Sequence, residues 1–126
     1  MKIFIGVLFL ILLTGCTSIY IREIRPKPDI SALNNGVDLG SVVNSPQQLY
    51  PKKEHSRQQG GWVLLAVDVN SEGVLNNIKP IDYSPTKNFV PYAVKYAREA
   101  KLNKPEEGEV IKNYYFLVVF EIWKHE

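Results

Sequence analysis

The segment Tyr114 to Trp123, YYFLVVFEIW, restricts the fold of this chain more than any other feature. Its β-branched and aromatic residues predict a strand. Because side chains alternate along a strand, two apolar sets fall on opposite faces: Tyr114, Phe116, Val118 and Phe120 on one, and Tyr115, Leu117 and Val119 on the other. One face would be the hydrophobic core. The other is too apolar for open solvent, so we expect a cover made by the first helix, a partner or a second copy.

A short helix and a hairpin are predicted upstream of that strand. Residues 50–59 carry Pro in the first turn and are followed by Gly60-Gly61, a pattern typical of a helix and the glycine beyond it. Residues 62–69 and 74–83 predict two strands joined by a polar turn with a glycine. Pro80 in the second strand lacks an N–H group, which favours an edge position or a bulge.

A longer helix is predicted between the hairpin and the last strand, with Asn88 as its N-cap. One apolar stripe has helical spacing: Phe89, Tyr92, Ala93, Tyr96, Ala97 and Ala100. The order helix, strand, strand, helix, strand predicts an α+β domain. It would be a small antiparallel three-stranded sheet with one long helix packed on one face and a short N-terminal helix.

The N-terminus is predicted to be a targeting segment. Lys2 precedes an apolar run over residues 3–13, which is too short to span a bilayer but suits the core of a secretory signal. The run ends in LLTGC, and Cys16 is the chain's single cysteine. This ending resembles the bacterial lipobox. That resemblance implies a signal peptide over residues 1–15, acylation of Cys16 (palmitate among the acyl groups) and anchoring to a membrane through that residue.

A flexible, lipid-anchored tether is predicted over residues 16–46. Its density of proline and glycine, as in RPKP at 25–28 and NNG at 34–36, opposes regular structure. Fully extended, it would reach at most ~110 Å, so the folded domain over residues 47–126 could stand off the membrane. Thr17 after the cysteine, in place of Asp, favours the outer over the inner membrane by resemblance to enterobacterial sorting.

Composition argues against several function classes. A net charge of +2 with scattered basic residues gives no nucleic-acid footprint. His55 and His125 belong to no set with metal-ligand spacing. Ser56 and Ser84 lack a neighbouring base or a nucleophile elbow. We therefore predict that the protein is not an enzyme and has no catalytic residue, no cofactor and no metal site.

The order and spacing of these elements resemble the TonB C-terminal domain family over about Gln47 to Trp123. The resemblance rests on Tyr50-Pro51, Gly60-Gly61-Trp62-Val63, LLAVDV, the turn NSEG, Ile78, Phe89, Ala93, Ala97 and YYFLVVFEI. The stretch from Ala100 to Pro105 lacks the tryptophan with which the family usually ends its helix. A lipobox also stands where TonB proteins keep an uncleaved inner-membrane helix that contacts a proton-driven motor.

The resemblance implies a periplasmic module for protein binding and transport-related work, without motor coupling. It would recognise an extended segment of an envelope protein by strand addition to the last strand. The implied peptide-binding residues are Gln47, Gln48, Tyr114, Tyr115, Phe116, Leu117, Val118 and Val119. An alternative stays open, in which the chain is a structural or assembly lipoprotein that forms a homodimer or joins an envelope complex through its sheet edge.

Overall fold

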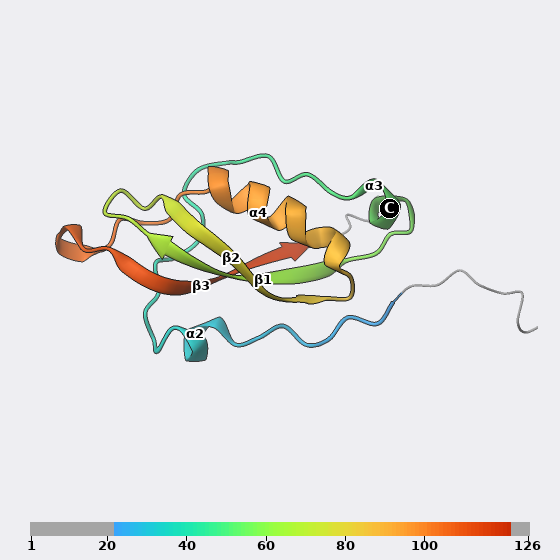
Figure 1. The fold of residues 1–126 in the computed structure, drawn as a ribbon, viewed down its shortest axis with the longest axis horizontal. Coiled ribbons are helices and arrows are strands. Elements are labelled where there is room, and N and C mark those ends of the chain that lie inside the picture. Colours follow the sequence, from blue (N-terminus) through green and yellow to red (C-terminus); the bar gives the residue numbers. More distant parts are fainter. Residues whose placement is uncertain (1–21, 122–126) are drawn as a thin grey trace, which may run out of the picture.

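A computed structural model describes residues 22–121, so the predicted signal peptide, Cys16 and Trp123 lie outside the described part. Three strands form one antiparallel sheet in the order β2-β1-β3 (Figure 1). The elements are α2 (Ile30–Leu33), α3 (Lys52–Ser56), β1 (Gly61–Val69), β2 (Leu75–Ser84), η1 (Lys87–Phe89), α4 (Val90–Glu99), η2 (Glu106–Gly108) and β3 (Ile111–Phe120). The predicted α+β class is confirmed. Between residues 22 and 121, no helix has the length and apolar character needed to cross a bilayer.

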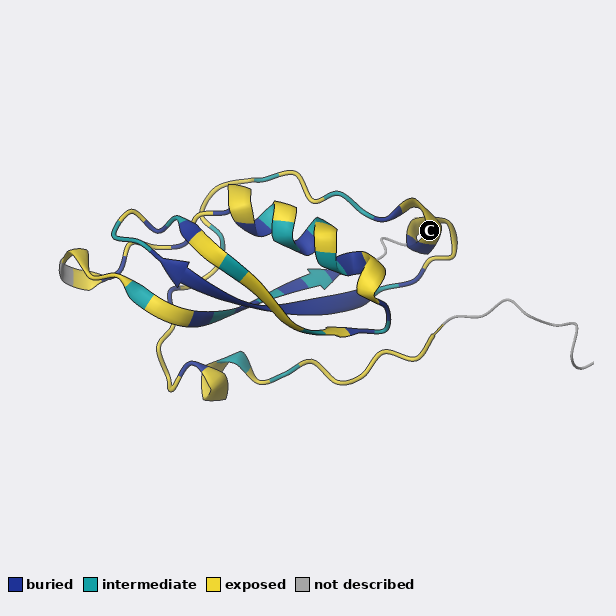
Figure 2. Ribbon diagram, in the orientation of Figure 1, coloured by how far each residue is buried: buried dark blue, intermediate teal, exposed yellow. Residues whose placement is uncertain are grey.

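The core lies between one face of the sheet and α4. β1 is buried over its whole length (Figure 2), because it is the central strand and both of its faces are covered. Ala93 and Ala97 are the buried residues of α4, and their small side chains let the helix approach the sheet closely. Of the two predicted sets of β3 side chains, the one that points into this core consists of Tyr114, Phe116, Val118 and Phe120.

β2 is an edge strand, and Pro80 lies at an irregularity in its pairing. Leu64 pairs with Asp82, whereas the next residue, Leu65, pairs with Pro80, so Ile81 has no opposite residue on β1. An extra residue of this kind forms a bulge. Both positions that the sequence suggested for Pro80, the edge and the bulge, are therefore confirmed.

Two local predictions were wrong. Asn88 does not cap α4: Thr86 accepts a hydrogen bond from the Asn88 N–H at 3.3 Å and caps η1, which leads into α4. The first helix ends at Ser56, four residues before the glycine pair that was predicted to stop it. Gly61 instead begins β1, where a Cβ atom would lie 2.4 Å from the Ser84 carbonyl oxygen and 2.7 Å from the Phe89 ring. This glycine is needed for close packing.

The far face of the sheet is covered by residues 22–34, which belong to the segment 16–46 that was predicted to be a flexible tether. Trp62 is only 2% exposed, and its Nε1–H donates to the Arg25 carbonyl at 2.8 Å. The Arg25 guanidinium lies 5.4 Å from the centre of the indole ring and pairs with Asp82 at 2.8 Å. The hydrogen bonds from Arg25 are the main cause that lowers the pKa of Asp82.

The prediction for this segment is therefore corrected where the structure describes it. Proline and glycine do keep residues 22–46 almost free of regular secondary structure, with only the one-turn helix α2. They do not prevent packing, because side chains of the domain bond the segment's backbone. The cover that the apolar far face required is supplied by the chain itself, and not by the first helix.

Candidate functional site

The outer edge of β3 is the first part of the candidate site. β3 pairs with β1 on one side only, which leaves its other side without a strand neighbour among residues 22–121. Asn34 and Gln48 bond backbone groups of Tyr115 and Val119, so these groups face away from β1. Because this direction alternates along an antiparallel pair, the N–H and C=O of Leu117 face outward too. Within the described chain, no hydrogen bond reaches them.

At one end of this edge, the Asn34 side chain takes the place of a neighbouring strand. Its Nδ2 donates to the Tyr115 carbonyl at 3.0 Å, and its Oδ1 accepts from the Tyr115 N–H at 2.8 Å. The side-chain amide thus makes the two hydrogen bonds that a residue of a neighbouring strand would make. Asn34 is buried and is the C-cap of α2, so the end of a one-turn helix holds the amide in place.

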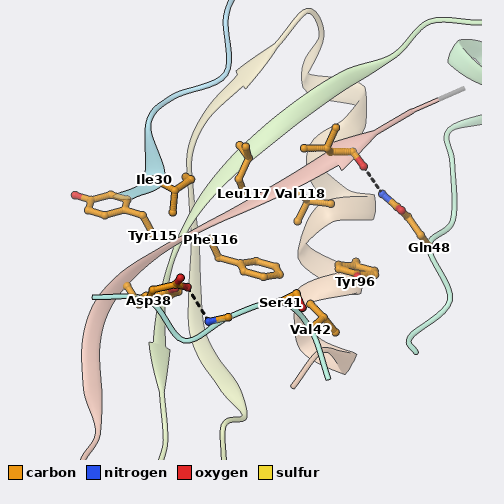
Figure 3. A pocket seen from close by; sticks show the side chains of 13 residues that line it. Ile30, Asp38, Ser41, Val42, Gln48, Tyr96, Tyr115, Phe116, Leu117 and Val118 are labelled. Carbon is orange, nitrogen blue, oxygen red and sulfur yellow. Dashed lines mark hydrogen bonds between the residues drawn. The ribbon is translucent and has the colours of Figure 1, made fainter. Parts of the chain in front are cut away.

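Gln48 occupies the other end of the edge. Its Nε2 donates to the Val119 carbonyl at 2.8 Å (Figure 3). Tyr115 and Val119 are four residues apart, which corresponds to about 13 Å along a strand. The outward groups of Leu117 lie between these two side-chain amides.

A groove of about 520 Å³ runs along this edge, between β3 and the chain at residues 38–48. Figure 3 shows Ile30, Tyr115 and Leu117 near one end and Tyr96, Val42 and Ser41 near the other. The Tyr96 ring lies parallel to the Phe116 ring at 6.4 Å and lines the groove from the helix side. Asp38 is the one charged residue among those that line it. The lining is otherwise apolar and uncharged polar, which suits an extended peptide.

The outer wall of the groove is fastened to the domain at several points. The Leu39 N–H donates to the Tyr114 hydroxyl at 3.2 Å, and Leu39 itself is buried. Asn44 makes two hydrogen bonds at the end of α4. Its Nδ2 donates to the Glu99 carbonyl, and its Oδ1 accepts from the Lys101 N–H. The groove is therefore built into the fold.

The predicted peptide-binding residues separate into groups. Tyr114, Phe116 and Val118 are buried in the core and reach the groove only in part, whereas Tyr115, Leu117 and Val119 are half-buried at its side. Gln48 lies on the edge, and Gln47 is exposed. Sequence reasoning missed Asn34 and Tyr96. NNG at 34–36 was interpreted only as a loop, and Tyr96 only as part of the helical stripe.

The buried carboxylate of Asp68 has a structural role. It accepts hydrogen bonds from Asn77 Nδ2 at 2.8 Å and the Asn113 N–H at 3.1 Å, and Lys112 Nζ lies 3.4 Å away. These partners, with Asn77 contributing most, lower the pKa of Asp68. The carboxylate thus ties β2 and β3 to the end of β1. In residues 22–121, no group of three or more His, Cys, Asp or Glu side chains could hold a metal ion.

Comparison with known proteins identifies the fold. No protein-family model matches the sequence, and no curated protein does either. The solution NMR structure of the Pseudomonas aeruginosa TonB C-terminal domain is similar, with a TM-score of 0.52 and 17% identity over 68% of this chain and 89% of that one. The domain has a TonB C-terminal-like fold.

A second solved structure, described as the TonB2 protein from Vibrio anguillarum, has a TM-score of 0.50 and 20% identity. That comparison covers 83% of this chain and 98% of the other, so it includes part of the segment before α3. At these identities the likeness establishes the fold alone. What the β3 edge of this chain does must be argued from its own residues.

Proposed function

We propose that this protein is a lipid-anchored periplasmic binding module of the bacterial envelope. Acylated Cys16 would hold it to a membrane, with the outer membrane favoured. Its domain would recognise an extended segment of another envelope protein by strand addition to β3, and it would not couple to a motor. The TonB C-terminal-like fold supports a role in protein interaction, and the lipobox-like LLTGC supports the anchor.

The observation that carries strand addition is the position of Leu117. Its outward N–H and C=O lie in a groove, between two edge groups that side-chain amides already bond. Backbone groups of an incoming strand can replace such amides one for one, because the same donors and acceptors are involved. About four residues of an added strand fit between the contacts of Asn34 and Gln48.

The lining of the groove indicates which segment fits. Side chains of an added strand alternate in direction. One set would face Ile30 and Leu117, and the other would face Tyr96 and Val42. An extended segment with small or medium apolar residues on both sides matches this lining. A basic residue opposite Asp38 would add charge complementarity.

Pairing of two copies through β3 fits the structure less well than binding of a single peptide. Two β3 edges can approach only if residues 38–48 of both copies leave the edge, and these residues are bonded to α4 and Tyr114. A single peptide needs only the existing groove. We likewise propose no enzymatic role for this groove.

A peptide titration followed by NMR tests the proposed function. Overlapping peptides from the exported proteins of the source bacterium are arrayed, and those retained by the protein are titrated into the isotopically labelled full chain. We expect the largest amide shifts at Leu117 and Val119, because the peptide backbone bonds groups beside them. Shifts confined to the loops after β1 and α4 would overturn strand addition at β3.

The Asn34→Ala variant is expected to bind such a peptide more tightly. Removal of its two hydrogen bonds to Tyr115 should cost about 1–2 kcal/mol of unfolding free energy. It also removes an internal competitor for the Tyr115 groups, so peptide affinity should rise about fivefold or more. Isothermal titration calorimetry measures the affinity, and urea unfolding measures the stability. Ser31→Ala, an exposed change in α2, should alter neither. An unchanged affinity in Asn34→Ala would show that this amide does not compete.

A further inference from the structure

The chain joins the domain much closer to Cys16 than its composition predicted. The Arg22 N–H donates to Gln59 Oε1 at 2.7 Å, and Gln59 Nε2 donates back to the Arg22 carbonyl at 3.1 Å. Gln59 is 4% exposed, so this pair of hydrogen bonds fixes Arg22 beside α3. Only residues 17–21 separate Arg22 from Cys16. Fully extended, that stretch spans at most about 20 Å.

The surface around this attachment point is basic. Two neighbouring hollows are lined by Arg22, Lys52, Lys53, Arg57 and Lys87, all of them exposed. We call these five residues the α3 basic cluster. Exposed Glu23 is a sequence neighbour of Arg22 and offsets part of this charge.

Glu54 does not place an exposed negative charge beside the α3 basic cluster. Among the described residues that line the two hollows, it is the only acidic one, and it is 6% exposed. Its Oε1 accepts from Asn88 Nδ2 at 2.6 Å, and its Oε2 has no protein partner among the described residues. Burial, followed by the charge of Glu54, raises the pKa of Tyr50 to about 12. The carboxylate therefore lies inside the domain, whereas the cationic groups extend outward.

The opposite end of the sheet carries charges of both signs. The loop before β3, at the far left of Figure 1, contains the acidic residues Glu106 and Glu109 and follows the exposed basic residues Lys101 and Lys104, whereas α3 lies at the right. The α3 basic cluster lies at the end of the domain where the chain leads back toward Cys16.

We propose that the α3 basic cluster lies on the membrane surface and binds the headgroups of anionic phospholipids. This inference rests on the acylation of Cys16 in the proposed function. The short connection keeps the cluster near the bilayer, and each basic residue near an anionic surface should favour the docked orientation about fivefold. The residues that line the β3 groove are different from those of the α3 basic cluster, so the cluster can contact lipid without occupying the groove.

Fluorescence energy transfer from the domain to the bilayer tests this orientation. The mature acylated protein, which begins at Cys16, is placed in vesicles of phosphatidylcholine alone or of an equal mixture with phosphatidylglycerol, with an acceptor on the lipid headgroups. A donor is attached through Ser56→Cys in α3 or through Glu106→Cys at the far end, both exposed positions. We expect stronger transfer from the Ser56 position, and a further increase there when phosphatidylglycerol is present.

Two charge-matched double variants test whether docking depends on the α3 basic cluster or only on net charge. Lys53→Gln with Arg57→Gln should lower the ratio of docked to undocked domain about 30-fold. Lys101→Gln with Lys104→Gln, at the other end of α4, makes the same change in net charge and should leave the ratio unchanged. Equal transfer from the two labels, transfer insensitive to phosphatidylglycerol, or equal behaviour of the two double variants would overturn the proposal.

A separate measurement tests whether Cys16 is acylated. The mass of the exported chain shows whether Cys16 is acylated, and a Cys16→Ala variant should be released from membranes. If the mass shows no acyl group on Cys16, the anchor is wrong and this inference falls with it. If the chain is acylated and binds peptides at β3 but transfer is equal at both ends, only the membrane orientation is overturned.

Discussion

Replacing Leu117 with proline is expected to abolish peptide binding at β3 while leaving the domain folded. The Leu117 N–H faces away from β1, so proline removes no hydrogen bond of the sheet itself. Proline is tolerated on edge strands for this reason. It deletes the donor that an added strand needs and puts a ring in its path. We expect the affinity to fall at least tenfold, about 1.4 kcal/mol or more.

The matched control for this prediction is Leu117→Ala, which removes the side chain but keeps the N–H. Because strand addition depends mostly on backbone groups, Leu117→Ala should bind at least about tenfold more tightly than Leu117→Pro. Calorimetry with the same peptide measures both, and circular dichroism melting checks that both are folded. Wild-type affinity in Leu117→Pro would show that the peptide does not bind by strand addition at this residue.

Trp62→Ala is expected to be the most destabilising single change on the far face of the sheet. Trp62 is 2% exposed and lies beneath the segment that begins at Arg22. Loss of a buried tryptophan side chain typically costs about 3–5 kcal/mol, from lost burial and the cavity left behind. A small domain has only about 5–15 kcal/mol of stability, so most of it would be lost. Urea unfolding measures the change.

Trp62→Phe separates the indole hydrogen bond from burial. Phenylalanine keeps an aromatic ring but cannot donate to the Arg25 carbonyl, and we expect a loss of about 1–3 kcal/mol. Hydrogen exchange should show faster exchange of the Arg25 amide in both variants, because that residue is held at the sheet partly through Trp62. A loss below about 1 kcal/mol in Trp62→Ala would mean that the cover over this face contributes little to stability.

The strand pattern of the sequence predicted the core well. The alternation in Tyr114–Phe120 separated the two side-chain sets, one of which is buried, and Pro80 indicated an edge position or a bulge, both of which occur. These predictions depend on the direction of successive side chains and on a missing N–H, which are properties of a few consecutive residues. The capping of α4 was missed because Thr86 and Asn88 are both good caps, and the intervening 3-10 turn decides between them.

The candidate site was predictable only in part. The sequence, with its resemblance to TonB C-terminal domains, predicted that the last strand would carry it. It did not predict Asn34, which lies 81 positions from Tyr115. Composition described residues 16–46 as a tether because proline and glycine disfavour helices and strands. Such residues can still be held by side chains elsewhere in the domain, as Gln59 and Trp62 hold the chain near Arg22 and Arg25.

By itself, the sequence determined the order of the elements, the two side-chain sets that fall on opposite faces of the last strand, and the need for a cover over the face that is not core. Only the tertiary structure decided that the chain's own residues 22–34 make that cover. It also decided that two side-chain amides bond the β3 edge and leave Leu117 between them. The physical reason is that periodicity is local, whereas the partners of Trp62 and Tyr115 lie 37 and 81 residues away.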